Sequence, residues 1–309
     1  MMKKVLVTPR SFGKTDPAAW QMLDDAGFTV LRNPTSSILN GEQLKELLAG
    51  CDGVIIGVDP LSANVLAAAP NLRAIAKYGV GTDNIDLEYC QIKGIKVSRT
   101  VGANSDAVAD YTLALMLAVA RQVVPIDQRC RQSDWSKITT IDVSNRTLGL
   151  LGLGAIGRGV AKRAAGFNMR VIAHDVYWDE AYSTSNGIER VTPEQIFREA
   201  DFVSLHLPLQ PETRNIVGEA ELAIMKPTAI LINTARGGLI DEQALLKALQ
   251  ERRIYGAGID AFSQEPPADP AWFTLDNLVL GSHAAASTIG ATEQMGRMAA
   301  RNLISDLID

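Results

Sequence analysis

Three side chains capable of acid–base or ionic chemistry follow three short apolar runs in the last third of the sequence. Arg236 comes after "AILINT", Glu265 after "YGAGID" and His283 after "LVLGS". A histidine can exchange a proton near neutral pH, and a carboxylate beside it can fix its tautomer. An arginine can bind a substrate carboxylate through two hydrogen bonds. This combination suits the transfer of a hydride between a cofactor and a 2-hydroxy or 2-keto acid.

These side chains can meet only if the three runs are strands of one sheet. Each run is typical of a strand in a parallel sheet, and ligands of open α/β sheets bind beyond the carboxyl ends of the strands. Taken singly, Arg236 could be a surface cation, Glu265 a loop acid and His283 a hydrogen-bonded buried imidazole. All three follow strand ends, and a glycine-rich turn typical of dinucleotide binding, described next, precedes them in the sequence. We therefore predict that they are catalytic.

That glycine-rich turn predicts where a dinucleotide would bind. The stretch "LGLLGLGAIGRGVAKRAAG" holds Gly152, Gly154 and Gly157 in the spacing G-x-G-x-x-G, between an apolar strand and an alanine-rich helix. The first glycine permits a tight turn, the second lets the backbone approach a pyrophosphate, and the third lets helix and strand pack closely. Asp175 ends the next strand, where a carboxylate binds ribose hydroxyls and repels a 2′-phosphate, so we predict NAD as the cofactor.

The motifs belong to a β/α series in the second part of the chain. Six strands are expected at residues 147–152, 170–174, 201–206, 229–234, 255–260 and 278–282, with helices between them. This alternation predicts a doubly wound domain. A final helix over about 289–307 has no strand of its own and could return to pack on the first domain.

The first third of the chain shows a similar alternation. Strands are expected at 4–8, 28–32, 53–57, 73–77 and 95–99, with helices near 17–26, 41–49, 62–68 and 86–92. The strands are continuous apolar runs, which is typical of a parallel sheet covered on both faces. The predicted fold class is therefore α/β, with two doubly wound parallel-sheet domains.

Residues 104–121, "NSDAVADYTLALMLAVAR", predict a long helix that is apolar nearly all round. Asn104, Ser105 and Asp106 are its N-cap candidates. A helix of this kind must be buried. Two interpretations remain open, a core helix inside one chain and a helix buried between two subunits.

Composition limits the partners. The 309 residues are 47% hydrophobic and 21% charged with a net charge of −5, which gives no reason to expect nucleic acid or an anionic membrane as a partner. No run approaches the 18 or so apolar residues of a membrane span. Cys51, Cys90 and Cys130 form neither a disulfide framework nor a metal-ligand pattern, so we expect a reducing cytoplasm and no bound metal.

The chain contains "LGLLGLGAIGRGVAKRAAGF", "INTARGGLIDEQALLKAL", "GAGIDAFSQEPP", "HAAAST" and "KYGVGTDNID". Together these stretches resemble the D-isomer-specific 2-hydroxyacid dehydrogenases, most closely the D-3-phosphoglycerate dehydrogenases without a regulatory domain. The resemblance covers nearly the whole chain. It implies a flavodoxin-like substrate domain from residues 1–99 and 288–309, a Rossmann NAD domain from residues 100–287, and a homodimer formed through the NAD domain.

The resemblance also implies roles for individual residues. The catalytic arginine, glutamate and histidine would be Arg236, Glu265 and His283. The cofactor site would use Gly152, Gly154, Ala155, Ile156, Gly157 and Asp175, with His206 and Pro208 on the adenosine side and Thr234 and Asp260 beside the nicotinamide. Substrate contacts would come from Lys77, Tyr78, Gly79, Val80, Gly81, Arg236 and Lys137, and the backbone N–H groups of "YGVG" would face the substrate carboxylate.

The chain departs from the phosphoglycerate dehydrogenase pattern at several positions. Gly57 and Lys137 stand where that group often carries phosphate-binding arginines, and Ser282 and Ala285 stand where proline and glycine are common. Lysine binds phosphate only as a point charge. The substrate is thus 3-phosphoglycerate or, alternatively, hydroxypyruvate, glyoxylate or another sugar acid. A third possibility is a non-catalytic NAD-sensing binding protein, against which the intact catalytic set argues.

Overall fold

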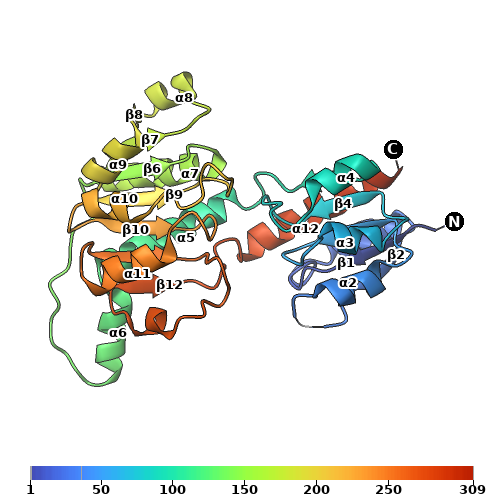
Figure 1. The fold of residues 1–309 in the computed structure, drawn as a ribbon, viewed down its shortest axis with the longest axis horizontal. Helices are drawn as coiled ribbons and strands as arrows, with labels where there is room; N and C mark the ends of the chain where they lie inside the picture. Colours follow the sequence, from blue (N-terminus) through green and yellow to red (C-terminus); the bar gives the residue numbers. More distant parts are fainter. Residues whose placement is uncertain (1, 36, 309) are drawn as a thin grey trace. The chain divides into compact units, whose positions relative to one another are not determined.

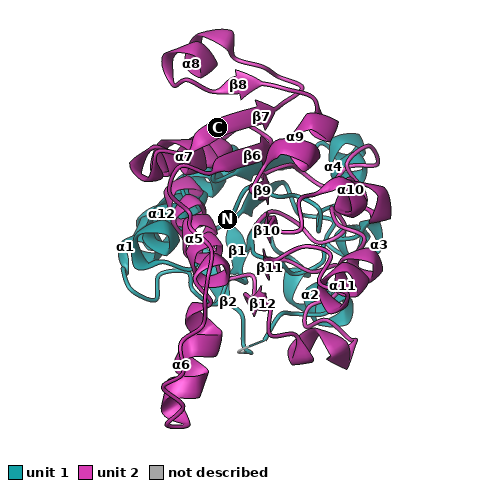
Figure 2. Ribbon diagram, turned by 90° about the vertical axis from the view of Figure 1, so that its left-hand side faces the viewer, with its two compact units in different colours: residues 1–104, 287–309 teal, residues 105–286 magenta. Residues whose placement is uncertain are grey.

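The computed structural model describes residues 2–35 and 37–308, which form two compact units (Figures 1 and 2). Unit 1 consists of residues 1–104 and 287–309, and unit 2 consists of residues 105–286. Unit 1 holds a five-stranded sheet and unit 2 a seven-stranded sheet, and every strand pairing is parallel. The predicted fold class, α/β with two parallel sheets, is confirmed.

The elements of unit 1 alternate between strand and helix. They are β1 (Lys4–Val7), α1 (Ala18–Asp25), β2 (Thr29–Arg32), α2 (Gly41–Leu48), β3 (Gly53–Ile56), α3 (Ala63–Ala67), β4 (Ala74–Lys77), α4 (Leu87–Lys93), β5 (Lys96–Arg99) and α12 (Ile289–Ile308). The strand order β2-β1-β3-β4-β5 is the flavodoxin-like order. Every residue of β3 and β4 is buried, because helices cover both faces of the sheet, and this explains their continuous apolar runs.

The last helix, α12, completes the core of unit 1. It packs against α1 and against strands β3, β4 and β5. Leu303 and Leu307 lie directly over Gly53, so close that a Cβ atom on residue 53 would be 2.9 and 2.8 Å from their Cδ1 atoms. A segment that follows unit 2 in the sequence therefore covers one face of the sheet of unit 1.

Unit 2 begins with α5 and then builds its sheet. Its elements are α5 (Ser105–Ala120), α6 (Val123–Arg131), β6 (Thr147–Leu151), α7 (Ala155–Ala164), η1 (Ala165–Phe167), β7 (Arg170–His174), α8 (Glu180–Ser185), β8 (Glu189–Arg190), α9 (Pro193–Glu199), β9 (Phe202–Leu205), α10 (Glu219–Ile224), β10 (Ile230–Asn233), α11 (Glu242–Gln250), β11 (Gly256–Ile259), η2 (Pro270–Thr274) and β12 (Leu278–Leu280). The order β12-β11-β10-β9-β6-β7-β8 is the Rossmann order with one further strand at the β12 edge. The order reverses between β6 and β9, where a doubly wound sheet binds its ligand.

Helix α5 is a core helix of unit 2. It packs against α7 and against β10 and β11, and its buried residues include Ala109, Met116 and Ala120. The interpretation as a core helix inside one chain therefore accounts for most of its apolar surface. In its last turn Leu117 and Ala118 are only half-buried, whereas Val119 and Ala120 are buried.

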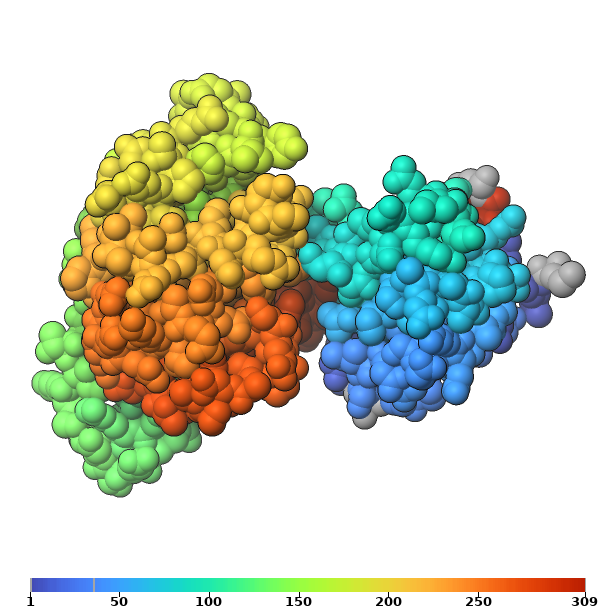
Figure 3. Space-filling view, in the orientation of Figure 1, coloured from blue at the N-terminus to red at the C-terminus, as the bar shows by residue number. Residues whose placement is uncertain are grey.

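Two elements of unit 2 were not predicted. Helix α6 lies between the helix expected at 104–121 and the strand expected at 147–152, where no element is predicted. Its nine residues are too few to establish a helical period, and they include Pro125. Strand β8 has only two residues, both exposed, at the edge of the sheet. Helix α6 projects from unit 2 in Figure 2 and forms the green ridge at the lower left of Figure 3.

Within residues 2–35 and 37–308, no single helix is both long enough and apolar enough to cross a membrane. Only α5 and α6 taken together reach that length and apolarity, and they are bent by 61° at their junction. Most apolar residues of α5 are buried in the core of unit 2.

Candidate active site

The imidazole of His283 and the carboxylate of Glu265 form a hydrogen-bonded pair beyond the ends of β11 and β12. The Nδ1 atom of His283 is 2.9 Å from Oε1 and 3.1 Å from Oε2 of Glu265. A carboxylate can only accept, so Nδ1 carries the proton of this bond. The Nε2 atom is then left for a second partner. Each side chain is 40% exposed, which is compatible with contact to a ligand.

Glu265 is held in its ionised form. Burial alone would raise its pKa, but the hydrogen bond and charge of His283, the Phe262 N–H group at 3.1 Å from Oε1 and the charge of Arg236 together lower the pKa below its ordinary value. The carboxylate therefore keeps its charge at neutral pH and can stabilise a positively charged imidazole.

The turn that carries Arg236 is shaped by the buried amide of Asn233, the last residue of β10. Asn233 donates from Nδ2 to the Arg236 carbonyl oxygen at 2.8 Å and accepts the Ala235 N–H at 3.0 Å. The next residue, Gly237, touches the loop of Glu265, since a Cβ atom there would be 2.2 Å from the Phe262 carbonyl oxygen. The loops after β10 and β11 thus hold each other, and the structure brings all three predicted catalytic side chains to one edge of the sheet of unit 2.

The glycine turn between β6 and α7 leaves room for a ligand. Gly152 has φ +100°, and a Cβ atom there would be 2.4 Å from the His206 carbonyl oxygen. A Cβ atom on Gly157 would be 2.2 Å from the Gly152 carbonyl oxygen, whereas nothing lies within 4 Å of one on Gly154. Gly152 and Gly157 are thus packed against neighbouring backbone, whereas the space beside Gly154, where α7 begins, is unfilled. This geometry fits a pyrophosphate at a helix N-terminus, beside Ala155 and Ile156.

Asp175 lies just beyond the end of β7 and contacts the same turn. Its carboxylate accepts the Leu153 N–H at 2.6 Å and the Tyr177 N–H at 2.8 Å. The side chain is only partly buried. Each carboxylate oxygen has a second lone pair, so the group can also accept hydrogen bonds from ribose hydroxyls.

The side chains of His206 and Thr234 are engaged inside unit 2. The Nε2 atom of His206 is 2.9 Å from the Ser204 hydroxyl, and burial lowers the pKa of this imidazole to about 4, so it is neutral. The Thr234 hydroxyl lies 2.8 Å from the hydroxyl of Thr112 on α5. Pro208 is exposed beyond β9. The backbone of His206 therefore contacts the glycine turn, while its ring is hydrogen-bonded to Ser204.

Asp260, the residue that follows β11, is almost fully buried at 1% exposure. Its carboxylate accepts the N–H groups of Ala284 and Ala285, each at 2.9 Å. The sequence resemblance placed Asp260 beside the nicotinamide. The structure shows in addition that it contacts the turn that carries His283.

In unit 1, Lys77 is buried at 6% exposure and its ammonium group is engaged. It donates to the Gly57 carbonyl oxygen and, at 2.7 Å, to Oδ1 of Asn84. The Gly79 N–H donates to the Thr100 hydroxyl at 2.8 Å, and the Tyr78 hydroxyl donates to the Thr292 carbonyl oxygen at 3.0 Å. Within the described residues of this loop, the N–H groups of Val80 and Gly81 make no hydrogen bond and can still donate to a ligand.

Lys137 is exposed on the segment between α6 and β6, and it makes no hydrogen bond to the three catalytic candidates among the described residues. Three residues that shape the site were not predicted as site residues. They are Asn233, whose side-chain amide holds the turn of Arg236, and Gly237 and Gly281, which lie too close to Phe262 and Asp260 to carry a side chain. The two glycines stand beside predicted catalytic residues in the sequence, which was the only available signal.

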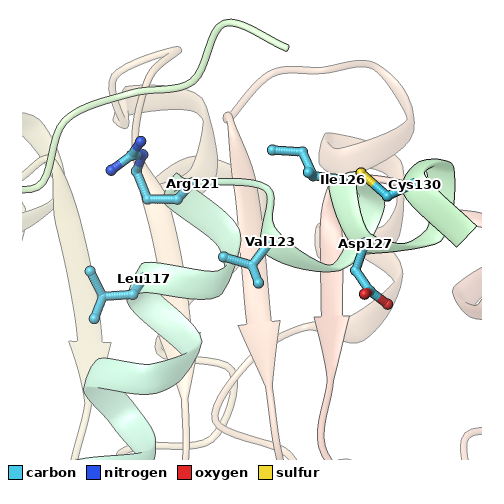
Figure 4. Close-up of a pocket in the computed structure, with 6 residues that line it drawn as sticks. All are labelled: Leu117, Arg121, Val123, Ile126, Asp127 and Cys130. Carbon is cyan, nitrogen blue, oxygen red and sulfur yellow. The ribbon is translucent and has the colours of Figure 1, made fainter. Parts of the chain in front are cut away.

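Away from this edge, an open groove lies where α5 meets α6 (Figure 4). Its lining residues are Leu117, Arg121, Val123, Ile126, Asp127 and Cys130. No group of three or more His, Cys, Asp or Glu side chains in the described part of the chain is arranged to hold a metal ion.

Comparison with known proteins gives consistent results. Residues 113–285 match the family model for the NAD-binding domain of D-isomer-specific 2-hydroxyacid dehydrogenases. A glyoxylate reductase of Korarchaeum cryptofilum is 43% identical over 84% of this chain and 81% of the relative. A D-3-phosphoglycerate dehydrogenase of Methanocaldococcus jannaschii is 39% identical over 86% of this chain but only 51% of its own length. The solved structure of the TT0316 protein of Thermus thermophilus aligns with a TM-score of 0.90 and 38% identity, over 99% of this chain and 97% of that one.

Proposed function

This chain belongs to the D-isomer-specific 2-hydroxyacid dehydrogenases, and we propose that it reduces a small unphosphorylated 2-keto acid, glyoxylate or hydroxypyruvate, with NADH. Like its family, it is an NAD-dependent oxidoreductase that acts on the CH–OH group of its substrate. We assign cofactor binding to unit 2 and substrate binding to unit 1. The borders between the two units, at residues 104 and 287, lie close to the domain boundaries predicted at residues 99 and 288.

The state of Lys77 is the observation that carries the choice of substrate. The ammonium group of Lys77 is buried at 6% exposure and donates to the Gly57 carbonyl oxygen and to Asn84, so it is turned to partners inside unit 1. Gly57 itself offers no side chain where phosphoglycerate dehydrogenases often carry arginine. Unit 1 therefore favours a substrate with a single anionic group, and the similarity to a glyoxylate reductase supports the same choice.

The catalytic roles follow from the site in unit 2. When bound, NADH supplies the hydride to C2 of the keto acid. His283, protonated on both ring nitrogens, donates the Nε2 proton to the carbonyl oxygen as that oxygen becomes a hydroxyl. Glu265 holds the Nδ1–H bond and stabilises the charged imidazole before transfer. Arg236 binds the substrate carboxylate and polarises its carbonyl group.

The cofactor would be held along the carboxyl edge of the same sheet. Gly152, Gly154 and Gly157 form the pyrophosphate turn with Ala155 and Ile156 at the start of α7, and Asp175 accepts the ribose hydroxyls. His206 and Pro208 border the adenosine side, and Thr234 and Asp260 border the nicotinamide. In unit 1, the N–H groups of Val80 and Gly81 would bind the substrate carboxylate.

A panel of substrates tests the proposed function. NADH oxidation is followed at fixed pH with glyoxylate, hydroxypyruvate, pyruvate and 3-phosphohydroxypyruvate, and NAD reduction is followed with the matching hydroxy acids. We expect kcat/KM for glyoxylate or hydroxypyruvate to exceed that for the phosphorylated acid at least ~10-fold, the effect of roughly one missing charged hydrogen bond. A preference for 3-phosphohydroxypyruvate would favour 3-phosphoglycerate as the substrate instead, and turnover of none of these acids would remove the proposal.

We also propose that the protein forms a homodimer through unit 2. Val123, which lines the groove between α5 and α6, is 53% exposed, and its neighbour Val124 on α6 is 41% exposed. Trp135, in the segment that follows α6, is 79% exposed. A cluster of this kind marks an interaction surface. The groove also carries both a cation, Arg121, and an acid, Asp127, so two copies related by a twofold axis would present complementary charges.

Light scattering after size exclusion tests the dimer. The expected mass is twice the 33.3 kDa of one chain, and Val123→Asp should shift the protein toward the monomer. Ile92→Asp is the matched control, because Ile92 is an equally apolar side chain, 73% exposed, on α4 of unit 1. A monomeric wild type, or a dimer unaffected by Val123→Asp, would contradict this interface. A reducing compartment such as the cytoplasm remains a prediction, supported by the three free cysteines.

A further inference from the structure

His283 has a backbone conformation that its surroundings must enforce. Its φ is +57°, in the left-handed region that side chains other than glycine rarely occupy. Such a conformation persists only where neighbouring groups hold it. If this turn relaxed, the imidazole would leave the position from which Nδ1 reaches Glu265.

Asp260 supplies the groups that hold the turn. Its backbone carbonyl oxygen accepts the His283 N–H at 2.8 Å. Its carboxylate accepts the next two N–H groups, with Ala284 on Oδ1 and Ala285 on Oδ2, both at 2.9 Å. Three successive N–H groups of the turn therefore bind one buried residue at the end of β11. A carboxylate is suited to this task because both of its oxygens accept hydrogen bonds, whereas an amide has only one accepting oxygen.

The structure also makes room for this carboxylate. A Cβ atom on Gly281 would be 2.1 Å from Oδ1 of Asp260, closer than any real contact, so a larger residue at position 281 would displace the carboxylate. Gly281 does not have a positive φ, so its need for glycine comes from the nearness of Asp260 and not from its own backbone conformation.

We propose that Asp260 is a positioning residue for His283: its carboxylate fixes the left-handed turn at residues 283–285 and thereby places the imidazole against Glu265. The role rests on the proposed function only in that His283 is taken as the proton-transfer group. It needs no contact between Asp260 and the cofactor. Asp260 acts on the reaction through the backbone that carries His283.

Three variants of the full chain test this role. Asp260→Asn keeps the size of the side chain but turns an NH₂ group toward one of the two turn N–H groups. Gly281→Ala leaves the residue type at position 260 unchanged, but the added methyl group displaces the Asp260 carboxylate from the N–H groups of the turn. Asp201→Asn is the matched control, because Asp201 also accepts a backbone N–H, that of Thr147 at 2.8 Å, but does so at the amino end of the same sheet.

Two measurements separate positioning from a general structural role. The first is steady-state kinetics with the best keto acid, together with the NADH dissociation constant from fluorescence. The second is the long-range ¹H–¹⁵N spectrum of ¹⁵N-histidine-labelled protein, which reports the tautomer of each imidazole. The chain has three histidines, so the signals can be assigned, and His206 serves as an internal reference.

For both Asp260→Asn and Gly281→Ala we expect kcat to fall on the order of 10- to 100-fold, the usual effect of misplacing a catalytic group by about an ångström. The NADH dissociation constant should change by a smaller factor than kcat, since Asp260 borders only the nicotinamide and the pyrophosphate turn is untouched. In the spectrum, His283 should change from the Nδ1-protonated tautomer to a mixture, while His206 stays unchanged. Asp201→Asn should lower the melting temperature without altering kcat or the His283 signal.

The proposal is overturned if Asp260→Asn retains kcat and the wild-type His283 tautomer, or if Asp201→Asn changes them equally. If Asp260→Asn does not fold, Gly281→Ala decides by the same criteria. The spectrum needs neither substrate nor turnover. A wild type that reduces no keto acid would therefore refute the proposed function and still leave the positioning role open to the tautomer measurement.

Discussion

Gly237 and Phe262 touch backbone to backbone, at a distance that leaves no space for a side chain on residue 237. A Cβ atom there would be 2.1 Å from the carbonyl carbon of Phe262 and 2.2 Å from its oxygen. This contact joins the loop of Arg236 to the loop of Glu265, although the two loops leave different strands. The backbone therefore holds the loop of Arg236, the proposed substrate-binding cation, against the loop of Glu265.

Gly237→Ala should disturb both loops at once. Inserting a methyl group into such a contact costs about 1–3 kcal/mol of folding free energy, and the loops should move apart. We expect a lower melting temperature and a loss of kcat/KM on the order of 10- to 100-fold. Gly166→Ala is the control, because nothing lies within 4 Å of a Cβ at residue 166 and its φ is not positive. Equal activities of the two variants would contradict this account.

His283→Ala should remove proton transfer while leaving the cofactor site intact. Loss of a general acid typically lowers kcat about 10²- to 10⁴-fold. The NADH dissociation constant should stay within about threefold, because the glycine turn lies at other strand ends. Glu265→Gln should reduce kcat less, because the amide can still accept the Nδ1–H bond but no longer carries charge. Fluorescence titration and steady-state kinetics measure both effects, and a His283→Ala enzyme with near-normal kcat would exclude the acid–base role.

The arrangement of the three proposed catalytic residues was predictable, because parallel strands end at a common edge. Arg236, Glu265 and His283 each follow an apolar run, and that single rule places them together once the runs are neighbours. The structure confirms the neighbours, since β10, β11 and β12 lie side by side in the sheet. The order and type of the main strands could likewise be predicted from their continuous apolar runs.

The groups that hold the site could not be predicted in the same way. Gly237 and Gly281 act through distances between segments that leave different strands, and no local sequence pattern encodes such distances. Asn233 holds its own turn through its side-chain amide, and its residue type alone does not reveal this. The engagement of Lys77 with Gly57 and Asn84 also depends on three separate segments. Helix α6 was missed for another reason, because its nine residues are fewer than the stretch over which an apolar period identifies a helix.

Asp175→Ala should weaken NADH binding and relax the preference for NADH over NADPH. The variant loses the acceptor for ribose hydroxyls and also the bonds to the Leu153 and Tyr177 N–H groups that brace the turn. A charge-assisted hydrogen bond contributes roughly 1.5–3 kcal/mol, so KM for NADH should rise about 10- to 100-fold. KM for NADPH should rise less, because a negative charge facing the 2′-phosphate is gone. Asp142→Ala serves as the control, because Asp142 is exposed and its carboxylate lies 3.9 Å from its ion-pair partner Arg146.

His206 should make stability depend on pH in weak acid. Its folded-state pKa is about 4 against an ordinary value of 6.5, so between these values the unfolded chain binds a proton that the folded chain does not. The stabilisation is fully present above pH 6.5 and is lost as the pH falls toward 4, amounting to at most about 3 kcal/mol. Urea unfolding at pH 7, 6, 5 and 4.5 measures it. His206→Gln should show a smaller decline over this range than the wild type, and parallel declines would refute the assignment.

Gly57→Arg should bring activity toward phosphorylated acids. A Cβ atom at residue 57 would make only ordinary contacts, at 3.5 Å or more from Asp59 and Pro9, so the side chain can be accommodated. An arginine there supplies a bidentate cation at a position where the wild type has no side chain. We expect kcat/KM for 3-phosphohydroxypyruvate to rise at least ~10-fold relative to that for glyoxylate. Gly57→Gln, of similar shape but uncharged, should not produce the change, and a rise with both variants would argue against a charge effect.

The position of α12 sets an order on how the chain can fold as it is synthesised. Residues 105–286 are continuous, so unit 2 can close its sheet as soon as its last strand has emerged from the ribosome. The strands of unit 1 are synthesised first, but its core is incomplete until α12 has been made. Leu303 and Leu307 of that helix cover Gly53 and the sheet around it. During translation the first hundred residues therefore remain without part of their core while a complete neighbour folds. A stalled or shortened product that ends before residue 287 would contain a finished unit 2 attached to an unfinished unit 1, with an apolar sheet face open to chaperones and proteases.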